Sequence, residues 1–153
     1  MFGLRALEAL RQGSGAVRAT MHRLPAPILS RLSFATSEWA ADFADVKKAV
    51  KDGDATIVDV RNPEELKTDG KIPTSISLPL PEIKEAVALS EDNFKKRYGV
   101  ARPGERDPLI LHCRGGVRAQ KAAALLTEAG FSNLRVYQGS FADWVSQGGP
   151  VDK

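Results

Sequence analysis

The chain has 153 residues, 42% hydrophobic and 27% charged, which is typical of a soluble globular protein with a single domain. Its net charge of +3 is uneven, because residues 1–36 carry five arginines and one acidic residue while the remainder is nearly neutral, so the charge does not indicate a nucleic-acid-binding protein. A single cysteine excludes an intramolecular disulfide and a cysteine zinc cluster, and two histidines, one of them in residues 1–36, argue against a histidine-based metal site. No apolar run is long enough to span a membrane.

Residues 1–36 are rich in Arg, Ala and Leu and poor in acidic residues. Their leucines and arginines segregate onto two faces of a helix, which predicts a mitochondrial transit peptide and a protein of the mitochondrial matrix. A chloroplast transit peptide, a disordered basic arm and a surface-binding helix are the alternatives. The folded domain is then expected over residues 37–150.

Beyond residue 36, helical and strand patterns alternate. Ser37 is placed to cap a helix that ends at residues 52–54, with a short edge strand at residues 38–39 as an alternative. Apolar runs predict strands at residues 56–60, 75–78, 109–111 and 134–137. Helices are predicted near residues 63–66, 81–89, 90–98, 119–130 and 141–146. This alternation predicts an α/β fold with a central, mainly parallel sheet of about five strands and helices on both faces.

The surroundings of Cys113 stand out. An apolar strand precedes it, and Gly115 and Gly116 follow it before a helix, so Cys113 is expected in a loop that opens a helix. Unpaired N–H groups at a helix start favour a thiolate, a bound oxyanion or a persulfide, and Arg114 and Arg118 add positive charge. The pattern predicts a thiol with a lowered pKa. The alternative, a buried structural cysteine, does not require these glycines and arginines.

Four stretches, in order, resemble the single-domain rhodaneses, a family of sulfurtransferases with mitochondrial members. Residues 113–119 (Cys-Arg-Gly-Gly-Val-Arg-Ala) resemble its active-site loop, and residues 57–61 (Ile-Val-Asp-Val-Arg) resemble an early strand. Residues 70–79 resemble its Gly-His-Ile-Pro-Gly-Ala segment, although Lys71, Thr74 and Ser75 depart from it. Residues 133–144 resemble the last strand and its Gly-Gly-x-x-x-Trp ending, with Ser140 in place of the second glycine.

The resemblance implies a thiosulfate sulfurtransferase. The Cys113 thiolate would take a sulfane sulfur from thiosulfate or a persulfide donor and pass it to glutathione, cyanide or a protein thiol. The expected substrate-binding residues follow it in the loop: Arg114, Gly115, Gly116, Val117 and Arg118. The intermediate is a covalent cysteine persulfide, so no metal or organic cofactor is expected. A rhodanese-like binding or redox-sensing module and a persulfide carrier for a biosynthetic pathway are the alternatives.

Three residues near the expected site have competing roles. Asp59 ends a strand and is expected to give structural support by pairing with an arginine rather than to act in catalysis. Arg61 is expected to be structural too, with Glu64 or Glu65 as its partner. His112 is expected to pack and hydrogen-bond on the opposite face of the strand from Cys113.

A cysteine phosphatase is the main rival among enzymes. Its loop has the form His-Cys-x5-Arg, in which the arginine clamps the phosphate. The position six residues after Cys113 is Ala119, and Arg118 comes one residue too early. The loop is therefore too short for that phosphate cradle, and the phosphatase is disfavoured.

Overall fold

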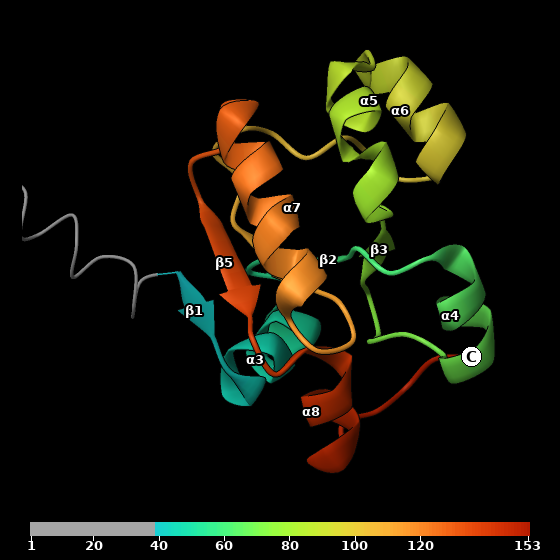
Figure 1. Cartoon of the computed structure of the whole chain (residues 1–153), viewed down its shortest axis with the longest axis vertical. Coiled ribbons are helices and arrows are strands. Elements are labelled where there is room, and N and C mark those ends of the chain that lie inside the picture. The colour runs from blue at the N-terminus through green and yellow to red at the C-terminus, as the bar shows by residue number, and fades with distance from the viewer. Residues whose placement is uncertain (1–38) are drawn as a thin grey trace, which may run out of the picture. The chain divides into compact units, whose positions relative to one another are not determined.

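The structure is a computed structural model that describes residues 39–153. It confirms the predicted α/β fold, in which strands and helices alternate along the chain (Figure 1). The strands are β1 (Ala40–Ala41), β2 (Thr56–Asp59), β3 (Ile76–Ser77), β4 (Leu109–His112) and β5 (Leu134–Tyr137). The helices are α3 (Phe43–Asp52), α4 (Pro63–Asp69), the 3-10 turn η1 (Leu80–Glu82), α5 (Ile83–Ala88), α6 (Glu91–Tyr98), α7 (Val117–Glu128) and α8 (Ser140–Ser146).

The five strands form one sheet in the order β1-β5-β4-β2-β3, and every pair is parallel. The register aligns Asp59 at the end of β2 with His112 at the end of β4. Because all strands point the same way, the segments that follow β2, β4 and β5 leave the sheet at one edge. Ligands of open α/β sheets bind at this carboxyl edge.

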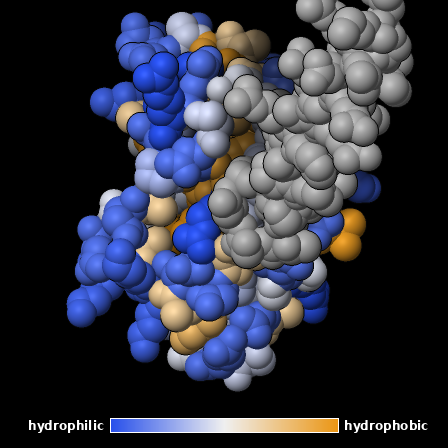
Figure 2. Space-filling view, turned by 90° about the vertical axis from the view of Figure 1, so that its left-hand side faces the viewer, coloured by the Kyte–Doolittle hydropathy of each residue, from blue (hydrophilic) through white to orange (hydrophobic). Residues whose placement is uncertain are grey.

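Apolar side chains cover both faces of the sheet, since successive strand residues point to opposite sides. One cluster contains Val58, Leu111 and Cys113 together with buried residues of α5, α6 and α7. The other contains Ile57 and Ile110 with buried residues of α3 and α8. The described residues on the face that Figure 2 shows are mainly hydrophilic, with hydrophobic ones in small groups. With α5, α6 and α7 on one face and α3 and α8 on the other, helices cover both faces of the sheet, as the sequence predicted.

The start of the first described helix differs from the prediction. The side chain of Asp42 caps α3 by accepting from the N–H of Asp45, and the Asp45 side chain accepts from the N–H of Asp42 in return. This reciprocal capping starts the helix at Phe43 and leaves Trp39 ahead of β1. The prediction of a helix from Ser37 onward is wrong over residues 39–42. Ser37 itself lies outside the described residues, as does the predicted transit peptide.

Two other segments differ in detail. The helix predicted at residues 81–89 is divided into η1 and α5, and α8 begins at Ser140, one residue earlier than predicted. The β3 strand is only two residues long. Over residues 39–153, no helix has the length and apolar character needed to cross a membrane.

Candidate active site

Cys113 lies one residue beyond β4 in the loop that leads into α7, and the residue is 1% exposed. The backbone N–H of Gly116 donates a hydrogen bond to its sulfur at 3.0 Å. Burial raises the pKa of the thiol, but hydrogen bonds from the backbone N–H groups of Ala119, Gly116 and Gly115 lower it by more, so the pKa of Cys113 lies below its ordinary value. The loop therefore stabilises a thiolate, as the sequence predicted.

The two loop glycines have different roles. Gly116 has φ +102°, a conformation that favours glycine, and a Cβ at this position would collide with the backbone oxygen of Gln138. A Cβ on Gly115 would meet no atom within 4 Å. Gly116 is thus the residue that allows the backbone to turn its N–H toward the sulfur.

Ser140 is a residue of this site whose role the sequence analysis missed. It is fully buried, and its hydroxyl accepts from the N–H of Cys113 at 3.1 Å and donates to the carbonyl of Tyr137 at 2.8 Å. The same oxygen lies 3.9 Å from the Cys113 sulfur. Ser140 has φ +56°, a left-handed conformation that costs a non-glycine residue of order 1–2 kcal/mol. The replacement of a glycine in the motif was the available signal, and strain at such a contact is typical of functional sites.

The start of α8 is tied directly to the cysteine loop. The N–H of Phe141 donates to the carbonyl of Cys113 at 2.9 Å, and the N–H of Ala142 donates to the carbonyl of Arg114 at 3.1 Å. These bonds satisfy donors at the start of a helix that has no side-chain cap. The segment after β5 and the segment after β4 are therefore joined by backbone hydrogen bonds at Cys113 and Arg114.

Arg114 and Arg118 differ in whether their side chains have an ion-pair partner. Arg118 makes a two-pronged ion pair with Glu65 of α4, with distances of 2.7 and 2.9 Å. Because the hydrogen bond from Arg118 favours the carboxylate, the pKa of Glu65 falls to about 2. The side chain of Arg114 is exposed and has no hydrogen-bond or ion-pair partner among residues 39–153. Val117 between them is 66% exposed. Arg114 is therefore the loop arginine whose charge is uncompensated.

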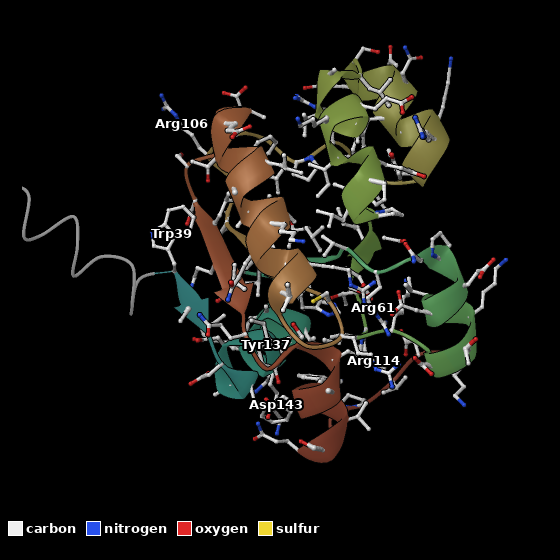
Figure 3. All side chains as sticks on the ribbon, in the orientation of Figure 1. Trp39, Arg61, Arg106, Arg114, Tyr137 and Asp143 are labelled. Atoms are coloured by element: carbon white, nitrogen blue, oxygen red, sulfur yellow. The ribbon has the colours of Figure 1, made fainter. Side chains whose placement is uncertain are left out.

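A buried charge cluster lies beneath the loop. Arg61 donates to the Asp59 carboxylate through Nε and Nη2, the shortest distance being 2.7 Å, and Nη2 also donates to the carbonyl of Gly70 at 2.8 Å. Both side chains are fully buried, and the guanidinium lies 4.0 Å above the ring of Phe141. Figure 3 shows Arg61 in the interior between α4 and α7. Asp59 pairs with an arginine as predicted. The predicted partners of Arg61 are wrong, since Glu65 binds Arg118 and Arg61 binds Asp59.

His112 borders this cluster. Its Nδ1 lies 3.2 Å from the carbonyl oxygen of Cys113, and its Nε2 lies 3.6 Å from Asp59. Burial lowers the pKa of His112 more than the nearby carboxylate raises it, so the ring is neutral near pH 7. The ring contacts the backbone of the cysteine, in keeping with the packing role expected for it. Within residues 39–153, no group of three or more His, Cys, Asp or Glu side chains is arranged to hold a metal ion.

The sequence of residues 42–147 matches the family model of the rhodanese-like domain. The chain belongs to the rhodanese-like domain family. It is 37% identical over 109 residues to the rhodanese domain-containing protein CG4456 of Drosophila melanogaster, which covers 71% of this chain and 98% of the relative. It is 38% identical to the thiosulfate:glutathione sulfurtransferase of Saccharomyces cerevisiae, over 70% of this chain and 78% of the relative.

A solved structure supports the same fold. The crystal structure of the Saccharomyces cerevisiae single-domain sulfurtransferase RDL2 superposes with a TM-score of 0.66 at 34% identity, covering 74% of this chain and 93% of that one. The curated RDL2 sequence is named a mitochondrial thiosulfate sulfurtransferase and is 40% identical over 61% of this chain and 62% of the relative.

Proposed function

We propose that this rhodanese-family protein transfers a sulfane sulfur from thiosulfate to glutathione through a persulfide on Cys113. The observation that carries the proposal is the hydrogen bond from the N–H of Gly116 to the Cys113 sulfur, within a loop that lowers the pKa of the thiol. The substrate classes are supported by the names of the Saccharomyces cerevisiae relatives, a thiosulfate:glutathione sulfurtransferase and a thiosulfate sulfurtransferase.

In the first half-reaction the Cys113 thiolate attacks the outer sulfur of thiosulfate. A bond forms between the two sulfurs, the original sulfur–sulfur bond of thiosulfate breaks, and its electron pair leaves with sulfite. The unpaired Arg114 attracts the dianionic donor. The terminal sulfur of the persulfide is an anion, so it takes the hydrogen bonds that the backbone N–H groups of the loop offer.

In the second half-reaction a glutathione thiolate attacks the outer sulfur of the persulfide. The bond to Cys113 breaks and its electron pair restores the cysteine thiolate, while glutathione leaves as its persulfide. Because the chain has one cysteine, no second thiol of the same molecule is available for this step. All group transfer takes place on the cysteine, so the mechanism uses neither a metal nor an organic cofactor.

Further acceptors and the cellular location extend this proposal. Cyanide and protein thiols are nucleophiles that can attack the same outer sulfur, and we include them as acceptors. We assign the protein to the mitochondrial matrix, supported by the basic, acid-poor residues 1–36 and by the mitochondrial name of RDL2. Residues 1–36 then act as the transit peptide.

Steady-state sulfur transfer from thiosulfate tests the proposal, with glutathione and cyanide as separate acceptors. We expect turnover with both acceptors in the wild type and none in Cys113→Ser, whose fold is checked by circular dichroism. Turnover that persists in a folded Cys113→Ser protein refutes the role of this cysteine. A folded wild type without turnover on any acceptor shifts the function to a binding or redox-sensing module, or to a persulfide carrier with its own dedicated acceptor.

A further inference from the structure

A pocket of about 400 Å³ opens beside the cysteine loop, where α4, the loop and α8 meet. Its lining includes Asp69 from α4, Arg114 from the loop, and Phe141, Ala142 and Val145 from α8. Figure 3 shows Arg114 extending into the region between α4 and α8. The volume falls within the range of sites that hold small organic molecules.

The pocket borders the backbone that holds the nucleophile, although Cys113 itself is 1% exposed and is not among the residues that line it. Arg114 follows Cys113 in the chain, and the N–H of Phe141 donates to the Cys113 carbonyl at 2.9 Å. A molecule seated here therefore touches a chain neighbour of Cys113 and a residue that is hydrogen-bonded to its backbone. A thiol acceptor needs this proximity, because its sulfur must reach the outer sulfur of the persulfide while the rest of it is held nearby.

The charges of the lining are of both signs. The side chain of Arg114 has no hydrogen-bond or ion-pair partner among the described residues, and Lys153 adds a second cation to the lining. Lys153 is held beside α4 because Lys71 and Asp152 exchange two backbone hydrogen bonds of 2.8 and 2.9 Å. The carboxylate of Asp69 contributes the opposite charge, and its oxygen lies 4.0 Å from the otherwise unpaired Nη1 of Arg61.

The apolar part of the lining is also distinctive. Val145 is 50% exposed, and among residues 39–153 only Val117, the first residue of α7, is another large hydrophobic residue with comparable exposure. An exposed apolar side chain beside groups of both charges suits a site that holds an amphipathic small molecule. A pocket for thiosulfate alone requires cations but neither an apolar wall nor a carboxylate.

We propose that this pocket binds the peptide portion of the acceptor, a small zwitterionic thiol peptide such as glutathione. Arg114 and Lys153 would bind its carboxylates, Asp69 its ammonium group, and Val145 would contact its methylene groups. This inference rests on the proposed sulfurtransferase function and adds the residues that select the acceptor. Cyanide has no peptide portion and makes no use of the pocket.

A matched pair of variants tests the assignment. Ala142→Glu places a carboxylate in the pocket at an exposed position of α8, whereas Ala124→Glu makes the same change at an exposed position of α7 outside it. Thiosulfate is the donor, and glutathione, 2-mercaptoethanol and cyanide are compared as acceptors. Asp69→Asn is the second variant, since it removes the negative charge without adding bulk.

We expect Ala142→Glu to raise the KM for glutathione by about tenfold, the effect of roughly 1.4 kcal/mol of lost binding. Asp69→Asn should raise the same KM by a smaller factor. With thiosulfate at saturation, so that weaker attraction of the donor by Arg114 does not limit the rate, the constants for cyanide and 2-mercaptoethanol should stay unchanged in both variants. Ala124→Glu should match the wild type with every acceptor.

An unchanged KM for glutathione in Ala142→Glu and Asp69→Asn overturns the assignment. Equal losses with all three acceptors at saturating thiosulfate also overturn it, because they indicate damage to the cysteine loop rather than to acceptor binding. A wild type that transfers no sulfur even to cyanide refutes the proposed function itself, and this outcome is distinct from the other two.

Discussion

Replacing Arg61 by methionine tests whether the Asp59–Arg61 pair supports the fold or takes part in catalysis. Arg61 is fully buried and, among residues 39–153, supplies every side-chain hydrogen bond that the Asp59 carboxylate accepts. Methionine retains most of the apolar volume but no charge. The change leaves a carboxylate in the interior without its cation, and removes the hydrogen bond to the carbonyl of Gly70.

The expected loss of stability follows from this burial. Removing one partner of a buried ion pair costs about 3–5 kcal/mol, because the remaining charge is desolvated and unpaired. The free energy of unfolding of a single domain is roughly 5–15 kcal/mol, so Arg61→Met should lose a large share of it. At roughly 4 °C per kcal/mol for a domain of this size, the melting temperature should fall by about 12–20 °C.

Urea unfolding of the wild type, Arg61→Met, Asp59→Asn and the double variant measures this effect. The double variant should lose less than Arg61→Met alone, since the unpaired charge is gone. A loss below about 1 kcal/mol in Arg61→Met contradicts the structural role. So does a large fall in sulfur transfer with unchanged stability, which instead assigns the pair to catalysis.

Three further predictions concern the cysteine loop. Gly116→Ala should abolish most sulfur transfer because of its collision with Gln138, whereas Gly115→Ala should stay within about twofold of the wild type; equal effects contradict this. Ser140→Gly removes a hydrogen bond that lowers the pKa of Cys113, so the pH midpoint of its iodoacetamide alkylation should rise. An unchanged midpoint contradicts the effect of the Ser140 hydrogen bond on the Cys113 thiol. The pKa of Glu65 is about 2 against an ordinary 4.5, so its contribution to the free energy of unfolding is complete above pH 4.5 and is lost as the pH falls toward 2. Acid unfolding of Glu65→Gln should therefore lack that contribution, expected to be below about 1 kcal/mol for a part-exposed pair.

The order and type of most elements were predictable because their patterns are local. The β-branched run of β2 and the apolar run of β4 have few alternatives to buried strands, and the alanine spacing of α7 indicates a helix packed on a sheet. The boundary of α3 was mistaken because Ser37 and Asp42 are both good capping residues. The reciprocal bond between Asp42 and Asp45 decides between them, and it forms only when the helix starts at Phe43.

The site was predictable only in part. The position of Cys113 at the end of a strand and the start of a turn follows from adjacent residues. Two contacts do not, since each joins segments far apart in the chain: Glu65 with Arg118, and Ser140 with Cys113. A third, between Arg61 and the carbonyl of Gly70, depends on how α4 folds back between them. The pairing of Arg61 with Asp59 was missed for another reason. It is local, but the guanidinium folds back toward the end of β2 instead of pairing with Glu64 or Glu65 of α4.

The measurement that tests the central claim most directly is the intact mass of the protein after each half-reaction. After thiosulfate, the wild type should gain one sulfur atom on Cys113, and glutathione should then remove it. Cys113→Ser should gain none under the same conditions. A folded wild type that never gains the sulfur, or a Cys113→Ser protein that does, contradicts sulfur transfer through a Cys113 persulfide.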